Sequence, residues 1–158
     1  MLSPHFFLIT GIICAIIALI GGVWWWFSLK QLNYSDTDLV TIRFPKGTII
    51  AEVSTSILKH AAGLSARPSL ATDTGMLFIF SSPQKPTFWM KGMKFPLDFV
   101  WLKNGIVIDV NQNISVPQNL FDFNLVSPSQ KVDMVLEVNV GTIEKMGIKV
   151  GDVVSIKK

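Results

Sequence analysis

Cysteine is almost absent from this sequence of 158 residues, because Cys14 is the only one. A single thiol cannot form a disulfide framework within the chain, and it excludes zinc sites built from paired cysteines. The sequence also has no Gly-rich phosphate loop, no His-Glu-x-x-His motif and no Gly-x-Ser-x-Gly motif. These absences argue against the common nucleotide-binding, zinc-peptidase and serine-hydrolase mechanisms. We therefore expect neither a metal nor a cofactor.

Charge is scarce as well, because charged residues make up only 16% of the chain and none precedes residue 30. The 14 Lys and Arg exceed the 11 Asp and Glu by 14 − 11 = 3, and they are scattered along the sequence. A net charge this small, without a basic patch, does not favour nucleic-acid binding. We therefore expect no nucleic-acid partner.

The longest run without an ionisable group other than Cys14 covers residues 6–27. As a helix it would be about 33 Å long, which is enough to cross a hydrocarbon core. Three Trp at 24–26 and Lys30 follow, where interfacial anchors are expected. A cleaved signal peptide would need a basic start and a small-x-small cleavage site, and neither is present. We predict an N-terminal transmembrane anchor over residues 1–29, with residues 6–27 in the membrane.

The rest of the chain divides into a short polar stalk over residues 30–38 and a single compact domain over residues 39–158. All basic residues follow the apolar run, and the positive-inside rule taken alone would place the domain in the cytoplasm. Long domains, however, cross the membrane largely regardless of their charge. We favour a single-pass membrane protein whose domain is extracytoplasmic.

The domain has the pattern of a β-rich protein. A continuously apolar run at residues 76–80 predicts a central buried strand, and short helices are expected at residues 54–63 and from Thr142 to Gly147. Further strands are predicted at 39–44, 48–53, 132–138 and 153–156 and on both sides of Asn104-Gly105. We predict an α+β domain, predominantly β: a small barrel-like or curled, mostly antiparallel sheet with two short helices.

Asn104-Gly105 between two β-rich runs is a strong hairpin signal. A two-residue turn would place Trp101 opposite Ile108 and Phe99 opposite Val110. This face of the hairpin is almost wholly apolar. We therefore expect Phe99 and Trp101 to belong to the core.

The other face of the same hairpin would place Asp98 opposite Asn111 and diagonal to Asp109, with side-chain stems roughly 5 to 7 Å apart. Two carboxylates at this separation could have different pKa values and act as acid and base, or they could hold a hard cation. In the alternative interpretation, Asp98 ties down its own loop and Asp109 is a solvated strand residue.

A set of short segments occurs in a characteristic order: Glu52-Val53-Ser54, Gly63-Leu64-Ser65-Ala66-Arg67, Phe88-Trp89-Met90-Lys91, Pro96-Leu97-Asp98, Val135-Leu136-Glu137 and Gly151-Asp152. This order resembles the bacterial and archaeal family called domain of unknown function 192. The resemblance covers roughly residues 39–156 and implies a compact β-rich domain, commonly behind a signal peptide or anchor, without an established activity. Members of that family usually have Asn where this chain has Gly92, and often Met where it has Ser65.

The binding surface that we expect centres on the aromatic segment before the hairpin. Trp89 and Met90 are either core residues or the wall of an apolar pocket, and Lys91 adds a cation beside them. Glu52 is expected to pair with Lys91 or Arg67, or to line a pocket. The candidate binding residues are Glu52, Trp89, Met90, Lys91, Asp98, Asp109, Asn111 and Phe121.

From these features we expect a membrane-anchored, extracytoplasmic binding or accessory domain that recognises a small molecule, a glycan or another envelope component. One alternative is a small cofactor-independent hydrolase or lyase that uses Asp98 with Asp109 or Glu52. Another is a protein-interaction scaffold that uses the long connection over residues 112–131. We favour binding over catalysis and name no catalytic residue. His60 has no second His or Cys partner in the domain, and we expect it to be inert.

Overall fold

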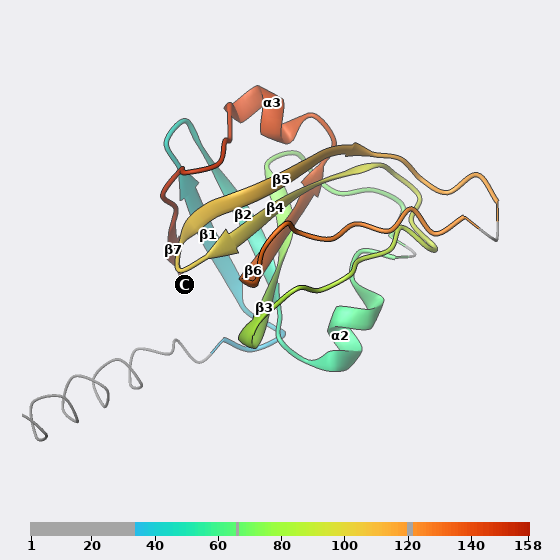
Figure 1. Ribbon diagram of the computed structural model, residues 1–158, viewed down its shortest axis with the longest axis horizontal. Helices are drawn as coiled ribbons and strands as arrows, with labels where there is room; N and C mark the ends of the chain where they lie inside the picture. Colours follow the sequence, from blue (N-terminus) through green and yellow to red (C-terminus); the bar gives the residue numbers. More distant parts are fainter. Residues whose placement is uncertain (1–33, 66, 120–121) are drawn as a thin grey trace, which may run out of the picture. The chain divides into compact units, whose positions relative to one another are not determined.

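Seven strands form one sheet in the computed structural model, which describes residues 34–65, 67–119 and 122–158 (Figure 1). The strands are β1 (Leu39–Phe44), β2 (Gly47–Ser54), β3 (Thr74–Gln84), β4 (Leu97–Lys103), β5 (Ile106–Ile114), β6 (Val132–Asn139) and β7 (Ser155–Lys157), and the helices are α2 (Ile57–Ala62) and α3 (Thr142–Met146). The order across the sheet is β5-β4-β6-β3-β2-β1-β7, and every neighbouring pair is antiparallel except β2 and β3. The prediction of a mostly β domain with two short helices is confirmed.

The sheet is not closed into a barrel. Its two ends are nevertheless joined by an isolated bridge between Ile106 in β5 and Val153 just before β7. Two backbone hydrogen bonds flank this bridge, from Val107 N to Asp152 O at 2.9 Å and from Val154 N to Gly105 O at 2.8 Å. The sheet is therefore curled, and its two edges meet at one end.

The predicted anchor over residues 1–29 lies outside the residues that the structure describes. Within the described ranges, no helix is both long enough and apolar enough to cross a membrane. The last residues of the predicted stalk do belong to the compact unit, which begins at Tyr34. Asp36 accepts hydrogen bonds from the backbone of Thr55 at 2.6 Å and of Ser56 at 3.1 Å, next to the start of α2.

Two hydrophobic clusters pack on opposite faces of the sheet. The first includes Leu136 and Val138 of β6 and is covered by Ile143 and Met146 of α3. The second includes Val135 of β6 and lies on the side of α2, so the two helices cover different faces (Figure 1). Because β6 lies between β4 and β3, both of its faces are buried. Other members of the second cluster are Leu64, Met76, Phe78, Met90, Phe99 and Trp101.

The β4–β5 hairpin turns at Asn104-Gly105 as predicted, and Lys103 pairs with Ile106. One step later the register shifts at a β-bulge, so that Trp101 pairs with Asp109 instead of Ile108. One extra residue in β5 exchanges the two faces of the strand from that point onward. The predicted pairing beyond Leu102 is therefore wrong. The prediction that Phe99 and Trp101 are core residues is confirmed, because both are fully buried.

The bulge also separates Asp98 from Asp109. Asp109 now shares a face with Trp101, whereas Asp98 lies on the face of Val100, which belongs to the first cluster. Neighbouring residues of a strand point to opposite sides of the sheet. The predicted meeting of the two carboxylates is therefore wrong.

Asp98 has a structural role, since its side chain is fully buried. Its carboxylate accepts hydrogen bonds from Asn113 N at 2.9 Å and from Ile143 N at 3.1 Å. Ile143 N is one of the first amides of α3, and that helix starts at Gly141 without a side-chain cap. Asp98 thus supplies the acceptor that a capping side chain would provide. The helix expected from Thr142 to Gly147 is present, with Gly141 at its N-cap position.

Candidate functional site

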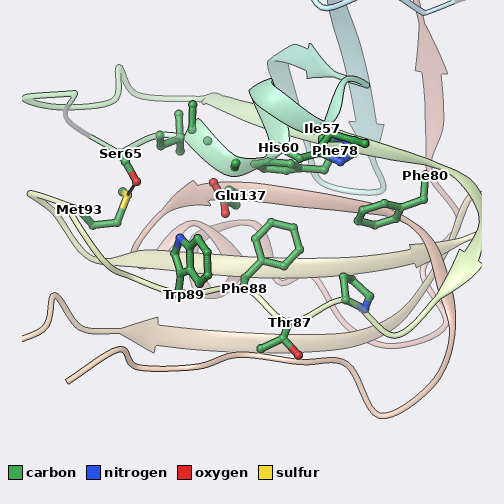
Figure 2. Close-up of a pocket in the computed structure, with 15 residues that line it drawn as sticks. Ile57, His60, Ser65, Phe78, Phe80, Thr87, Phe88, Trp89, Met93 and Glu137 are labelled. Atoms are coloured by element: carbon green, nitrogen blue, oxygen red, sulfur yellow. Dashed lines mark hydrogen bonds between the residues drawn. The ribbon is translucent and has the colours of Figure 1, made fainter. Parts of the chain in front are cut away.

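A pocket of about 280 Å³ opens between α2 and the segment over residues 86–93 (Figure 2). Its walls are largely apolar and aromatic, and Glu137 is its only acidic lining residue within the described part of the chain. Figure 2 shows Glu137 between α2 on one side and Phe88 and Trp89 on the other. The apolar and aromatic lining includes Ile57, Leu64, Phe78, Phe80, Phe88, Trp89 and Met93.

The strand register explains why Glu137 is in this pocket. In β6, Glu137 pairs with Met76 of β3 on one side and with Phe99 of β4 on the other. Both partners belong to the second cluster, and Glu137 itself is only 5% exposed. Its Oε2 atom has no hydrogen-bond partner among the described residues. A carboxyl group therefore lies in the centre of an apolar face, without a neighbour that satisfies it.

Burial raises the pKa of Glu137 to about 8. The cause is desolvation, because an apolar environment disfavours the charged form of a carboxyl group. At neutral pH most Glu137 side chains are therefore protonated, and each can donate one hydrogen bond and accept others. Buried polar groups without partners are rare and costly in native proteins, and acids with strongly raised pKa values are concentrated at functional sites.

Two of the predicted residues lie in the same row across the sheet as Glu137. The row runs from Glu52 in β2 through Met76, Glu137 and Phe99 to Asn111 in β5. The side chains at the two ends of the row, Glu52 and Asn111, have hydrogen-bond partners. At the centre of the row, Glu137 Oε2 has none among the described residues.

Glu52 forms a two-pronged ion pair with Arg67, with N–O distances of 2.6 and 2.7 Å. These hydrogen bonds hold the pKa of Glu52 below its usual value. One of the two ion pairs expected for Glu52 is thus present. At the other end of the row, Asn111 Oδ1 accepts a hydrogen bond from the Trp101 indole at 2.6 Å.

Asp109 lies in β5 outside the pocket lining, and it organises a loop. Its carboxylate accepts hydrogen bonds from Ser129 N at 2.7 Å and from Val110 N at 2.9 Å. Burial raises the pKa of Asp109, but these hydrogen bonds outweigh burial and keep the pKa below its usual value. The carboxylate therefore stays ionised and fixes the loop before β6.

The three residues from Trp89 to Lys91 lie in different environments: the pocket, the core and the surface. Trp89 lines the pocket and is 53% exposed, whereas Met90 is fully buried and donates its backbone N–H to Phe123 O at 2.9 Å. The Lys91 side chain is exposed, and its Nζ lies 5.9 Å from the centroid of the Phe123 ring. Phe121 lies outside the described residues. Of these residues, only Trp89 faces the pocket.

Gly92 and Ser65, the two positions expected to differ from other members of the family, lie close together. Gly92 has φ +77°, a left-handed conformation that Gly and Asn adopt more readily than other residues. A Cβ atom at position 92 would lie 3.7 Å from Ser65 Cβ. Ser65 itself lines the pocket and donates a hydrogen bond to Lys91 O at 3.1 Å. Small residues thus occupy both positions.

Sequence reasoning missed Glu137 and undervalued His60. Asp133 and Glu137 alternate with apolar residues in β6, a pattern typical of a strand with one solvated face, whereas the second hydrophobic cluster and α2 cover Glu137. The apolar Val135 between them was the available signal. His60 lines the pocket, with ring centroids 5.3 Å from Phe80 and 5.6 Å from Phe78, and its Nε2 lies 2.9 Å from Ser54 O.

The described residues contain no group of three or more His, Cys, Asp or Glu side chains arranged to hold a metal ion. The chemistry that the pocket does offer is an apolar cavity with one neutral acid and one imidazole.

Comparisons with known proteins bear on the family but not on the activity. A family model described as Uncharacterized ACR, DUF192, matches residues 40–156, which confirms the resemblance drawn from the short segments. A crystal structure of a protein from Sinorhizobium meliloti 1021, provisionally named a transcription regulator, superposes with a TM-score of 0.68 at 25% identity and covers 78% of this chain and 97% of its own.

A protein of unknown function from Novosphingobium aromaticivorans DSM 12444 superposes with a TM-score of 0.64 at 30% identity. The match covers 74% of this chain and 83% of that one. No protein with a curated function matches the chain.

Replacing Glu137 by Gln tests the buried acid through stability. The folded protein holds the Glu137 proton with a pKa of about 8, against 4.5 for an ordinary Glu, so it binds more protons than the unfolded chain between these values. The free energy of unfolding therefore falls as pH rises through this window, by up to about 1.4 kcal/mol per pH unit. We expect Glu137→Gln to remove this decline.

The measurement is chemical denaturation of the wild type and the variant at about pH 5.5 and about pH 8.5. The stability of the variant relative to the wild type should be clearly greater at the higher pH than at the lower pH. Glu144→Gln changes an exposed carboxylate and serves as the control. Parallel pH dependences of wild type and Glu137→Gln would show that Glu137 titrates normally.

Proposed function

This chain belongs to the DUF192 family, and we propose that its domain binds a small, largely apolar molecule in the pocket beside Glu137. The observation that carries this proposal is a buried carboxyl group without a partner inside an aromatic pocket. Small-molecule sites typically combine apolar walls with a few polar groups that fix the orientation of the ligand.

The pocket walls and the acid have separate parts in this function. Phe78 and Phe88 provide apolar surface whose removal from water favours binding, at roughly 25 cal/mol per Å². Trp89 at 53% exposure can cover a bound molecule from the solvent side. Glu137 offers its carboxyl group to a polar group of the ligand. Binding would then give this carboxyl group a hydrogen-bond partner that the described residues do not provide.

We further propose that the domain is held at the outer side of a membrane by the apolar segment over residues 6–27. The support is the length of this segment, the Trp residues at its end and the absence of a cleavage signal. In that setting, the ligand is a small molecule, glycan or other component of the envelope.

The two alternative functions have weaker support. Catalysis by Asp98 with Asp109 or Glu52 would need carboxylates that converge, but Asp98 and Glu52 lie on opposite faces of the sheet. A scaffold function would use the exposed side chains of Leu125 and Phe123 in the long connection, which are 65% and 41% exposed. Neither alternative accounts for Glu137.

Filling the pocket tests the binding function. Ala61 lines the pocket from α2, and Ala61→Phe would place an aromatic ring in the ligand's space. Leu58→Phe adds a ring to the same helix at an 84% exposed position outside the lining, and is the matched control. The full chain in maltoside micelles is screened by thermal shift against small aromatic compounds, short glycans and headgroup fragments.

A ligand at 100 times its Kd stabilises the folded state by about 2.7 kcal/mol. We expect at least one compound that raises the Tm of the wild type and of Leu58→Phe but not that of Ala61→Phe. The proposal is wrong if no compound stabilises the wild type, or if Ala61→Phe retains every shift.

Labelling in cells tests the location of the domain. Ser82 is exposed at the end of β3, and Ser82→Cys combined with Cys14→Ser gives a single reactive thiol on the domain. We expect a membrane-impermeant maleimide to label this variant in intact spheroplasts. Labelling that occurs only after lysis would place the domain in the cytoplasm.

A further inference from the structure

We infer that the pocket selects ligands that carry a protonated amine on a small apolar body, and that Glu137 is the residue that recognises the amine. This inference rests on the proposed binding function and specifies the ligand class. Its geometric basis is Glu137, which lines an aromatic cavity of about 280 Å³ and whose buried Oε2 has no hydrogen-bond partner among the described residues.

The pocket walls favour a cation over other polar groups. Phe78, Phe80, Phe88 and Trp89 line the pocket, and aromatic rings attract ammonium groups through the negative potential above the ring. Phe78 and Phe88 are themselves in edge contact, with centroids 4.9 Å apart. An apolar body of aromatic or aliphatic character would fill the remaining space.

No fixed positive charge opposes an amine in this cavity. Among the described lining residues there is no Lys or Arg, and His60 is the only basic group. Arg67 forms an ion pair with Glu52 of β2, and Met76 of β3 lies between Glu52 and Glu137 in the row. From β3 and β4 the immediate neighbours of Glu137 are the uncharged Met76 and Phe99. Lys91, on the segment over residues 86–93, lies over the Phe123 ring outside the lining.

The competing ligand chemistries gain less from these groups. A neutral alcohol or carbonyl can form one ordinary hydrogen bond with the protonated acid. An anionic ligand would lack a positive partner in the pocket and would lie beside a second acid. An ammonium ion instead forms a charge-assisted hydrogen bond with the ionised carboxylate, which is shorter and about twice as strong.

Amine binding is coupled to proton release. The neutral carboxylic acid and the ammonium ion enter the complex as a carboxylate and an ammonium ion, and the acid proton passes to the solvent. Because the pKa of free Glu137 is about 8, this release is nearly complete at neutral pH. Amine affinity should therefore rise close to tenfold per pH unit below pH 8, whereas the affinity of a neutral analogue should stay constant.

Three probes of nearly equal shape separate these possibilities: benzylamine, benzyl alcohol and benzoate. Each is titrated calorimetrically into the full chain in maltoside micelles, at about pH 6 and about pH 7.5 and in two buffers of different ionisation enthalpy. The proteins are the wild type, Glu137→Gln, the control Glu144→Gln and Ala61→Phe. Glu137→Gln keeps the shape of the side chain and removes its ability to ionise.

For the wild type and Glu144→Gln, we expect benzylamine to bind at least tenfold more tightly than benzyl alcohol, with release of close to one proton, and benzoate to bind weakest. Glu137→Gln should lose the amine preference and the proton release. Ala61→Phe should lose binding of all three probes.

The possible failures have different meanings. Benzyl alcohol binding that is blocked by Ala61→Phe, without an amine preference, would overturn the amine inference and leave the proposed binding function intact. An amine preference that persists in Glu137→Gln would also overturn the inference, because another group would then recognise the cation. If neither benzylamine nor benzyl alcohol binds at millimolar concentration, the amine inference fails as stated, and the broader compound screen decides whether the binding function fails with it.

Discussion

The burial of a carboxylic acid in the middle of a central strand is the constraint on which this interpretation of the domain depends. β6 lies between β4 and β3, so that both of its faces are covered, one by the first hydrophobic cluster and the other by the second. On the second face, Glu137 occupies a position between Met76 and Phe99 that an apolar residue would fill at no electrostatic cost. A position that costs stability is explained most simply by the ligand that it serves.

The elements around Glu137 surround it with apolar residues and leave the pocket open. α2 and the segment over residues 86–93 lie on either side of the pocket, and each is tied to the domain by contacts at its ends (Figure 2). Asp36 accepts hydrogen bonds from Thr55 and Ser56 just before α2, while Phe88 exchanges two backbone hydrogen bonds with Val126. On the opposite face, Asp98 fixes α3 against the sheet. The carboxylates of Asp36 and Asp98 thus stabilise the frame, whereas Glu137 Oε2 has no hydrogen-bond partner among the described residues.

Local signals were sufficient to predict most elements of the fold. The turn at Asn104-Gly105, the strand at residues 76–80 and Gly63 after α2 all act through backbone preferences that the residues themselves carry. The β-bulge after Leu102 has no comparable signal, and it moved Asp109 away from Asp98. The burial of Glu137 depends on the order of strands in the sheet, which short segments do not encode. Of the expected binding residues, Trp89 lines the pocket, whereas Glu52 and Asn111 lie in the same row as Glu137 but outside the lining, and Glu137 itself was not predicted.

Direct titration of the Glu137 carboxyl group is the most immediate test of this account. The full chain is labelled with ¹³C at the side-chain carboxyl carbon of Glu, and the Glu137 resonance is identified by its absence from Glu137→Gln. We predict a midpoint near pH 8, clearly separated from the other Glu residues, and a shift of this midpoint to lower pH when benzylamine is added. A midpoint near the ordinary value of 4.5 would contradict the account, because Glu137 would then be solvated and already ionised at neutral pH.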